Sequence, residues 1–137
     1  PAVITRSSNL GATSFQDLRT YDGRRVWEVV LGNVINSERR DILVVFSSRS
    51  NRDIRSFAAI LDGRFPVLFG GFGYQGVQAK DVNDVFSAGR YPPPIFNSSR
   101  ALTFPCHGGT YLENYASALE QSFAQAVQLT KEGGKTK

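Results

Sequence analysis

The order of apolar and polar positions in the first half of the chain predicts strands separated by a helix. Residues 24–32 combine β-branched and aromatic side chains, with Trp27, Val29 and Leu31 on one face, which favours a strand. Residues 41–48 form a continuous apolar run of strand length, typical of a central strand covered on both faces. A polar connection separates these two segments.

Further extended segments are expected on either side of these two. Residues 1–20 are polar and predict an arm or one early strand. Residues 64–69 predict a strand in which Pro66 cannot donate a ladder hydrogen bond, so that this strand starts there or lies at an edge. The prolines of residues 91–96 keep that segment extended, and residues 100–106 predict another strand.

Two short segments change to the helical period. Residues 50–63 carry apolar side chains at positions i, i+3, i+4 and i+7, with Ser50 or Asn51 as a cap and Gly63 after the last turn. Those apolar positions are Ile54, Phe57, Ala58 and Leu61. Residues 80–89 predict a second short helix, whose inward side chains are Val82, Val85 and Phe86.

A long C-terminal helix closes the chain. Thr110 and Glu113 have the spacing of a capping box, in which each side chain satisfies the other's free backbone N–H. Apolar residues then keep helical spacing to Val127, and we expect Leu119 and Phe123 to be buried.

Strands early, helices between them and a long final helix indicate an α+β domain. The expected architecture is an antiparallel or mixed sheet with two short helices and one long C-terminal helix packed on it. Residues 1–130 are predicted to form this single domain, and residues 131–137 a flexible tail.

Composition restricts the class of protein. Hydrophobic residues make up 41% and charged residues 20% of the chain, as in ordinary globular proteins. No apolar run approaches the roughly 20 residues of a membrane helix, so no membrane partner is expected. The first residues lack the features of a secretory signal, which favours an intracellular setting and leaves a mature exported form open.

Charge adds a functional hypothesis. Lysine and arginine total 16 against 12 acids, and ten of the twelve arginines lie within the first 64 residues. Guanidinium groups bind phosphate in bidentate fashion and stack on aromatic rings, which indicates nucleic acid as a partner; a solvated, solubilising surface is the alternative. The candidate nucleic-acid-binding residues are Arg24, Arg25, Arg39, Arg40, Arg49, Arg52, Arg55, Arg64, Phe72, Tyr74 and Lys80.

Two motifs suggest other chemistry. Cys106 and His107 are the only cysteine and the only histidine, and adjacent residues on a strand point to opposite faces, so we expect neither catalysis nor metal binding from them. Gly71 to Gly76 reads G-x-G-x-x-G, but no acidic residue follows about 20 positions later to bind a ribose. The aromatics Phe72 and Tyr74 within it are candidates for base stacking or for core packing.

Residues 77–96, followed by residues 102–111, resemble the small fungal guanyl-preferring ribonucleases. The shared features are a short helix, an aromatic-Pro strand, and a strand that ends near proline, glycines and tyrosine. The family's histidine after the aromatic-Pro is Pro93 or Val67 here, and its catalytic glutamate, arginine and second histidine have no matching positions. The resemblance therefore implies a non-catalytic relative.

The sequence thus predicts a non-enzymatic basic domain that binds RNA or single-stranded DNA, without cofactor, metal or catalytic residues. The alternatives are a self-assembling coat or scaffold subunit, which would be a homo-oligomer, and a small hydrolase or non-catalytic ribonuclease-like protein.

Overall fold

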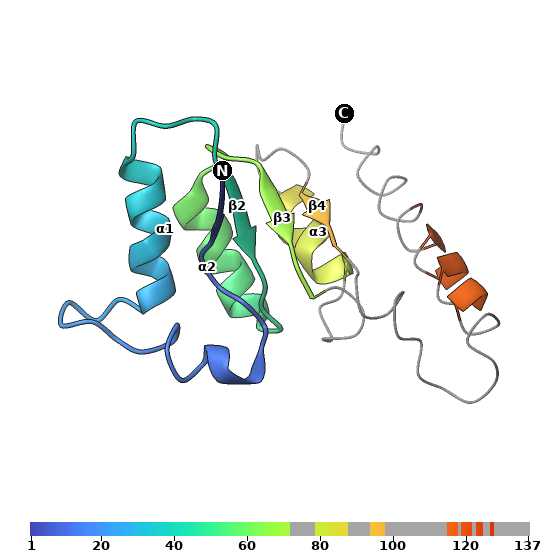
Figure 1. The fold of residues 1–137 in the computed structure, drawn as a ribbon, viewed down its shortest axis with the longest axis horizontal. Coiled ribbons are helices and arrows are strands. Elements are labelled where there is room, and N and C mark those ends of the chain that lie inside the picture. Colours follow the sequence, from blue (N-terminus) through green and yellow to red (C-terminus); the bar gives the residue numbers. More distant parts are fainter. Residues whose placement is uncertain are drawn as a thin grey trace.

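Strands and α-helices alternate along the chain in a computed structural model that describes residues 1–71, 79–87, 94–97, 115–117, 119–121, 123–124 and 127 (Figure 1). The elements are β1 (Ala2–Ile4), the 3-10 turn η1 (Leu10–Ala12), α1 (Val26–Asn36), β2 (Leu43–Phe46), α2 (Asn51–Leu61), β3 (Val67–Phe69), α3 (Ala79–Ser87) and β4 (Ile95–Phe96). The described residues between 115 and 127 are helical as well. No helix in the described part of the chain is both long and apolar enough to cross a lipid bilayer.

The four strands form one parallel sheet in the order β1-β2-β3-β4. The expected α+β fold with an antiparallel or mixed sheet is therefore wrong, and the fold is α/β. The physical reason is that a helix follows each of β1, β2 and β3 and carries the chain back, so that the next strand runs in the same direction.

The segment expected as a strand at residues 24–32 belongs mainly to helix α1. Trp27, Leu31 and Val34 are buried, and their i, i+4 and i+7 spacing forms one helical stripe against the core. The carboxylate of Glu28 accepts the backbone N–H of Arg25 at 2.7 Å and satisfies a free donor at the start of the helix. Packing of this stripe outweighs the strand preference of the β-branched residues beside it.

The other described elements agree with the sequence. The runs at 41–48 and 64–69 contain β2 and β3, and the segment at 50–63 contains α2. Ser50 caps α2, since its hydroxyl accepts the backbone N–H of Asp53 at 3.3 Å. In α3, Val82 and Phe86 are buried as expected.

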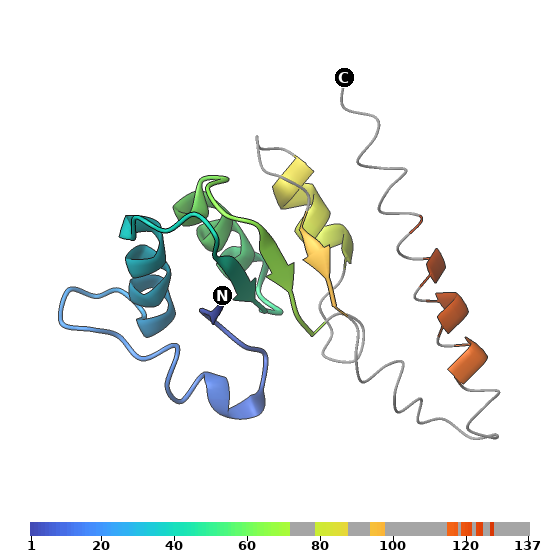
Figure 2. The same cartoon turned by 45° about the horizontal axis from the view of Figure 1, so that its top comes forward.

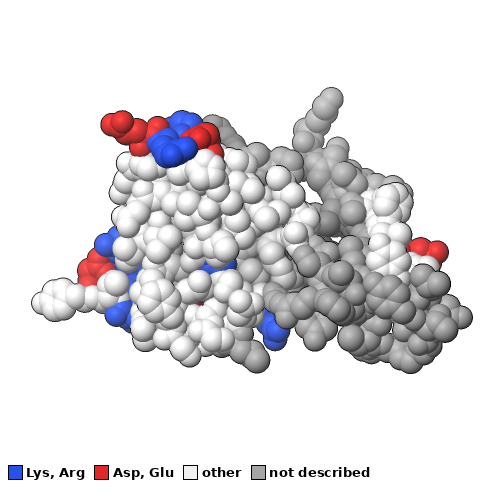
Figure 3. Space-filling model, in the orientation of Figure 1, with Lys and Arg blue, Asp and Glu red and all other residues white. Residues whose placement is uncertain are grey.

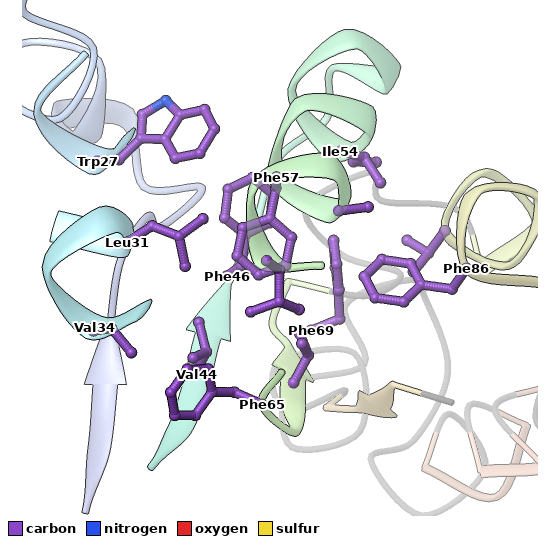
Figure 4. Close-up of a cluster of buried hydrophobic side chains, with 14 of the residues drawn as sticks. Trp27, Leu31, Val34, Val44, Phe46, Ile54, Phe57, Phe65, Phe69 and Phe86 are labelled. Atoms are coloured by element: carbon purple, nitrogen blue, oxygen red, sulfur yellow. The ribbon is translucent and has the colours of Figure 1, made fainter. Parts of the chain in front are cut away.

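An aromatic cluster between the sheet and the helices forms the centre of the core (Figure 4). Phe46 of β2 stacks on Phe57 of α2, with ring centroids 4.0 Å apart. The rings of Trp27 and Phe69 each meet Phe46 edge-on at 5.4 Å. Phe46 therefore joins α1, α2 and β3 around one side chain.

Helices α1, α2 and α3 all lie on the same side of the sheet, as the two ribbon views show (Figures 1 and 2). Right-handed crossovers between strands added in sequential order place every helix on one face. On the opposite face the strand register aligns a row of apolar side chains, here called the open face. It consists of Ile4, Val45, Leu68 and Ile95. Figure 3 shows this side, whose middle carries little charge.

The C-terminal helix differs from expectation. Leu119 and Phe123 are 48% and 71% exposed, so their expected burial is wrong. Among the described elements, none covers this apolar stripe. The capping box at Thr110 and Glu113, the expected strand at residues 100–106 and the tail at residues 131–137 lie outside the described residues.

Candidate functional site at the carboxyl ends of the strands

Buried polar residues gather where the strands end. Thr5 and Arg6 follow β1, and Ser47 and Ser48 follow β2; all four are buried. In parallel α/β folds the loops at the carboxyl ends of the strands carry the ligand site. This edge of the sheet is therefore the candidate site.

The Arg6 side chain donates three hydrogen bonds at this edge, and only 8% of the residue is exposed. Its Nε and Nη2 donate to both carboxylate oxygens of Asp17, at 3.1 and 2.9 Å. Its Nη1 donates to the backbone carbonyl of Ser47 at 3.0 Å. Arg6 thus fastens the loop that contains Asp17 to the ends of β1 and β2.

Asp53, in the first turn of α2, is the acidic counterpart of Arg6. One carboxylate oxygen accepts from Arg25 Nη1 at 2.5 Å. The other accepts from the hydroxyl of Ser48 at 3.1 Å and lies 3.6 Å from Arg6 Nη2. Because Asp53 is itself buried, these partners take the place of water around its carboxylate oxygens.

Arg25 completes the group at the start of α1. Burial opposes the charged form of Arg25, but hydrogen bonds to Asp53 and Glu28 outweigh it and raise the pKa of its guanidinium above the ordinary value. The guanidinium carbon also lies 4.6 Å from the ring centroid of Trp27. We call the whole group the strand-end cluster: Arg6, Asp17, Arg25, Glu28, Ser48 and Asp53.

The strand-end cluster holds two arginines against three carboxylates, so its net charge is slightly negative. Its ionised groups are paired with one another. We infer that the cluster fixes the loops after β1 and β2 and does not itself attract an anion.

At the end of β3, a hydrogen bond to Gly70 and the backbone conformation of Gly71 determine the path of the chain. The hydroxyl of Ser47 donates to the carbonyl of Gly70 at 2.6 Å, which ties the ends of β2 and β3 together. Gly71 then adopts a left-handed backbone conformation with φ of 78°. Only glycine takes this conformation without steric cost, so Gly71 sets the direction in which the chain leaves the sheet.

Replacement of Gly71 by alanine is expected to lower the free energy of unfolding by about 1–2 kcal/mol, the cost of placing an L side chain in the left-handed region. Chemical denaturation measures the change. Gly11, whose φ is not in that region and whose added Cβ would meet no atom within 4 Å, provides the control. An equal loss in Gly11→Ala would contradict the role assigned to the Gly71 turn.

The arginines proposed from sequence for nucleic acid lie at different places. Arg24 pairs with Asp22 at 2.5 Å and Arg39 with Asp41 at 2.7 Å, both on the surface. The hydrogen bond from Arg24, helped by one from Thr20, lowers the pKa of Asp22 well below its usual range. The guanidinium of Arg39 likewise lowers the pKa of Asp41, to about 2.

The remaining candidates do not gather at the strand-end cluster, apart from Arg25. Arg40 donates to the carbonyl of Ser37, and Arg64 lies 3.9 Å from Asp62. Four others are exposed, and two are not among the described residues. The exposed ones are Arg49, Arg52, Arg55 and Lys80. Phe72 and Tyr74 lie outside the described residues, and so do Cys106 and His107.

Sequence reasoning missed Arg6, Asp17 and Asp53 as site residues. Arg6 was one arginine among ten, and Asp53 was only a favourable first-turn residue of a helix. The sequence feature that could have indicated them is their position along the chain. Arg6 and Ser48 closely follow short apolar strand segments, and parallel strands bring such residues to one edge of the sheet.

No protein-family model matches the chain. A search of curated proteins by sequence also finds no match.

Solved structures of enzymes share the fold. A putative orotidine-monophosphate-decarboxylase from Toxoplasma gondii matches with a TM-score of 0.66 and 15% identity, over 96% of this chain and 50% of that one. The Leishmania donovani OMP decarboxylase matches with a TM-score of 0.60 and 17% identity, over 93% and 46%. The Leishmania donovani UMP synthase matches with a TM-score of 0.64 and 20% identity, over 92% and 27%. The chain thus spans half or less of the length of each.

The four strands and their helices correspond to a fragment of the TIM barrel of OMP decarboxylase. The fold therefore resembles that of an enzyme. The expected non-enzymatic RNA- or DNA-binding domain is wrong, together with its coat-subunit, hydrolase and ribonuclease-like alternatives.

Proposed function

We propose that the chain forms part of a barrel enzyme that binds a pyrimidine nucleoside monophosphate at the carboxyl ends of β1 to β4. The observation that carries the proposal is the agreement in fold, over more than nine tenths of this chain, with OMP decarboxylase structures. The buried polar residues lie at the edge of the sheet where barrel enzymes hold their substrates.

The loop after β1 is suited to contact an uncharged ring. The bonds from Arg6 to Asp17 and from the backbone N–H of Ser7 to Gln16 Oε1, at 2.8 Å, hold this loop in shape. The hydroxyl of Ser7, and the hydroxyl oxygen of Ser47 as an acceptor, offer hydrogen-bonding groups to the carbonyl and N–H groups of a pyrimidine. In this proposal Arg6 is a positioning residue, because its donors are already used.

The phosphate needs a different environment. Phosphate is held by backbone N–H groups or by cations that are not already neutralised, and the strand-end cluster has no surplus positive charge. The glycine-rich stretch that begins at Gly71, Gly71 to Gly76 in the sequence, has the composition that lets backbone approach a phosphate closely. We assign the phosphate to the β3 side of the site and the base to the β1 side.

Titration of the isotope-labelled chain with uridine 5′-monophosphate, followed by amide NMR shifts, tests the proposal. We expect shifts at Ser7, Ser48 and Gly71 and none at Asp41, which lies at the opposite end of β2. Adenosine 5′-monophosphate and inorganic phosphate are the controls: phosphate alone should move only the Gly71 region. Absence of shifts up to millimolar nucleotide, or shifts centred on Asp41, would contradict the proposed site.

A further inference from the structure

We infer that three exposed arginines near the start of α2 attract the phosphate of the nucleotide and raise the rate at which it reaches the candidate site. They are Arg49, Arg52 and Arg55, here called the α2 arginine surface. This inference rests on the proposed function and deepens it, because it names the group of the ligand that is recruited and the residues that recruit it. The α2 arginine surface guides the ligand, and the residues of the site then hold it.

The charges of the α2 arginine surface are not neutralised within the described part of the chain. Arg49 lies in the loop after β2, Arg52 and Arg55 lie on α2, and all three are exposed. No described residue forms an ion pair or a side-chain hydrogen bond with any of them. Each of the other described arginines donates to a carboxylate or a backbone carbonyl, or lies within 3.9 Å of a carboxylate. Among the described arginines, these three are therefore the ones whose charge is free to act on a ligand in solution.

The α2 arginine surface does not stabilise the helix that carries it. Arg52 and Arg55 are three residues apart on the solvent side of α2, where such side chains are neighbours and like charges repel. Arg52 also lies in the first turn, where the helix dipole favours acidic side chains over cations. The buried side of the helix, with Ile54 and Phe57, holds it to the core. Departures from local preference of this kind are expected at functional sites.

The α2 arginine surface begins close to the Gly71 turn, the part of the site to which the phosphate is assigned. Ser47, at the end of β2, donates to the carbonyl of Gly70 at 2.6 Å, and Gly71 follows directly. Arg49 is two residues after Ser47, a stretch of chain that spans at most about 7 Å. In about 0.1 M salt a charge acts over about 10 Å. The field of Arg49 therefore reaches a phosphate at the Gly71 turn.

The other charges at this edge of the sheet oppose the approach of a phosphate. The strand-end cluster has two guanidinium groups against three carboxylates. The start of α3 lies beside that of α2, because Asn51 donates to the carboxylate of Asp81 at 3.2 Å, and it adds Asp81 and the exposed Asp84 against one lysine, Lys80. A phosphate monoester carries about 1.5 to 2 negative charges at pH 7. The cations of the α2 arginine surface are therefore what makes the approach attractive.

NMR line shapes of the isotope-labelled chain, titrated with uridine 5′-monophosphate, give the rate constants of association and dissociation. Three variants are compared with the parent chain. The first combines Arg49→Gln, Arg52→Gln and Arg55→Gln, and the second places lysine at the same positions to keep the charge. The control combines three substitutions in the connections at the opposite end of the sheet: Arg39→Gln, Arg40→Gln and Arg64→Gln. Both glutamine variants remove three charges from the formal net charge of +4, and the amide spectrum of each variant establishes that it is folded.

At an ionic strength of about 0.1 M, the glutamine variant of the α2 arginine surface should associate about three to ten times more slowly than the parent chain. This is the low end of electrostatic steering, because salt screens part of the field. The dissociation rate should not change, and the lysine variant and the control should match the parent chain. At about 1 M, where charges act over only about 3 Å, all four proteins should associate at the same rate. Uridine, which lacks the phosphate, should bind to all of them alike.

Equal association rates in the parent chain and the glutamine variant would overturn the inference, and so would an equal loss in the control, which would make net charge alone the cause. Faster dissociation of the glutamine variant, or a loss in the lysine variant, would also overturn it, because either would show a contact that holds the phosphate. A parent chain that binds no uridine 5′-monophosphate would remove the proposed function together with this inference. Binding that the glutamine variant leaves unchanged would remove this inference alone.

Discussion

Replacement of Asp53 by alanine is expected to lower the free energy of unfolding by about 3–5 kcal/mol, the range for breaking a buried ion pair from one side. The carboxylate of Asp53 is the common partner of Arg25, Ser48 and, at 3.6 Å, Arg6. Its removal takes one carboxylate partner from each guanidinium group and leaves the Ser48 hydroxyl without its acceptor, in a site from which water is largely excluded. Urea denaturation followed by circular dichroism measures the loss.

Asp41→Ala is the matched control, because Asp41 also pairs with an arginine but does so in solvent. Solvent screens the Asp41 pair and competes for its hydrogen bonds, so no measurable change is expected. If the two variants unfold at the same denaturant concentration, the strand-end cluster does not hold the loops as described.

Replacement of Phe46 by alanine should cost about 3–5 kcal/mol, as for other fully buried aromatic residues. Phe46 contacts Trp27, Phe57 and Phe69, so its removal leaves a cavity bordered by elements from three parts of the chain. These elements cannot all collapse into the space at once, which keeps the cost high.

Phe15→Ala serves as the control, since Phe15 is an exposed phenylalanine of the loop between β1 and α1. We expect its midpoint of denaturation to stay within error of the parent chain. A Phe46→Ala variant that is equally unaffected would place the core elsewhere than between the sheet and α2.

The sequence was sufficient to predict those elements in which residue spacing and residue composition favour the same secondary structure. Within residues 41–48, positions 42–46 are all apolar, and they contain β2. Residues 50–63 carry both helical spacing and a capping serine at Ser50, and they contain α2. In these segments local preference and tertiary packing favour the same structure.

The direction of the sheet could not be predicted because one helix was misassigned. Val26, Val29 and Val30 favour a strand, while Trp27 and Leu31 also fit a helical stripe. Once this segment is assigned to a strand, a short polar connection joins it to the next strand, which implies an antiparallel pair. Recognition of α1 changes every later pairing, because each strand is then followed by a helix.

The candidate site could not be predicted from the sequence, for a related reason. Arg6 and Asp53 are far apart in the chain, and they meet only because β1 and β2 run parallel with Ile4 beside Val45. No local motif encodes that register. The charge of Arg6 was visible, but its pairing with Asp17 and Asp53 and its burial depend on the whole arrangement.

Parallel pairing of the strands is tested most directly by the nuclear Overhauser contacts of the isotope-labelled chain. The structure predicts backbone contacts between Ile4 and Val45, Val45 and Leu68, and Leu68 and Ile95, without close α-proton pairs across the sheet. In an antiparallel sheet, α-protons of facing residues approach closely at alternate pairs. Strong α-proton contacts between these strands, or pairing of residues 24–32 with β2, would contradict the parallel sheet.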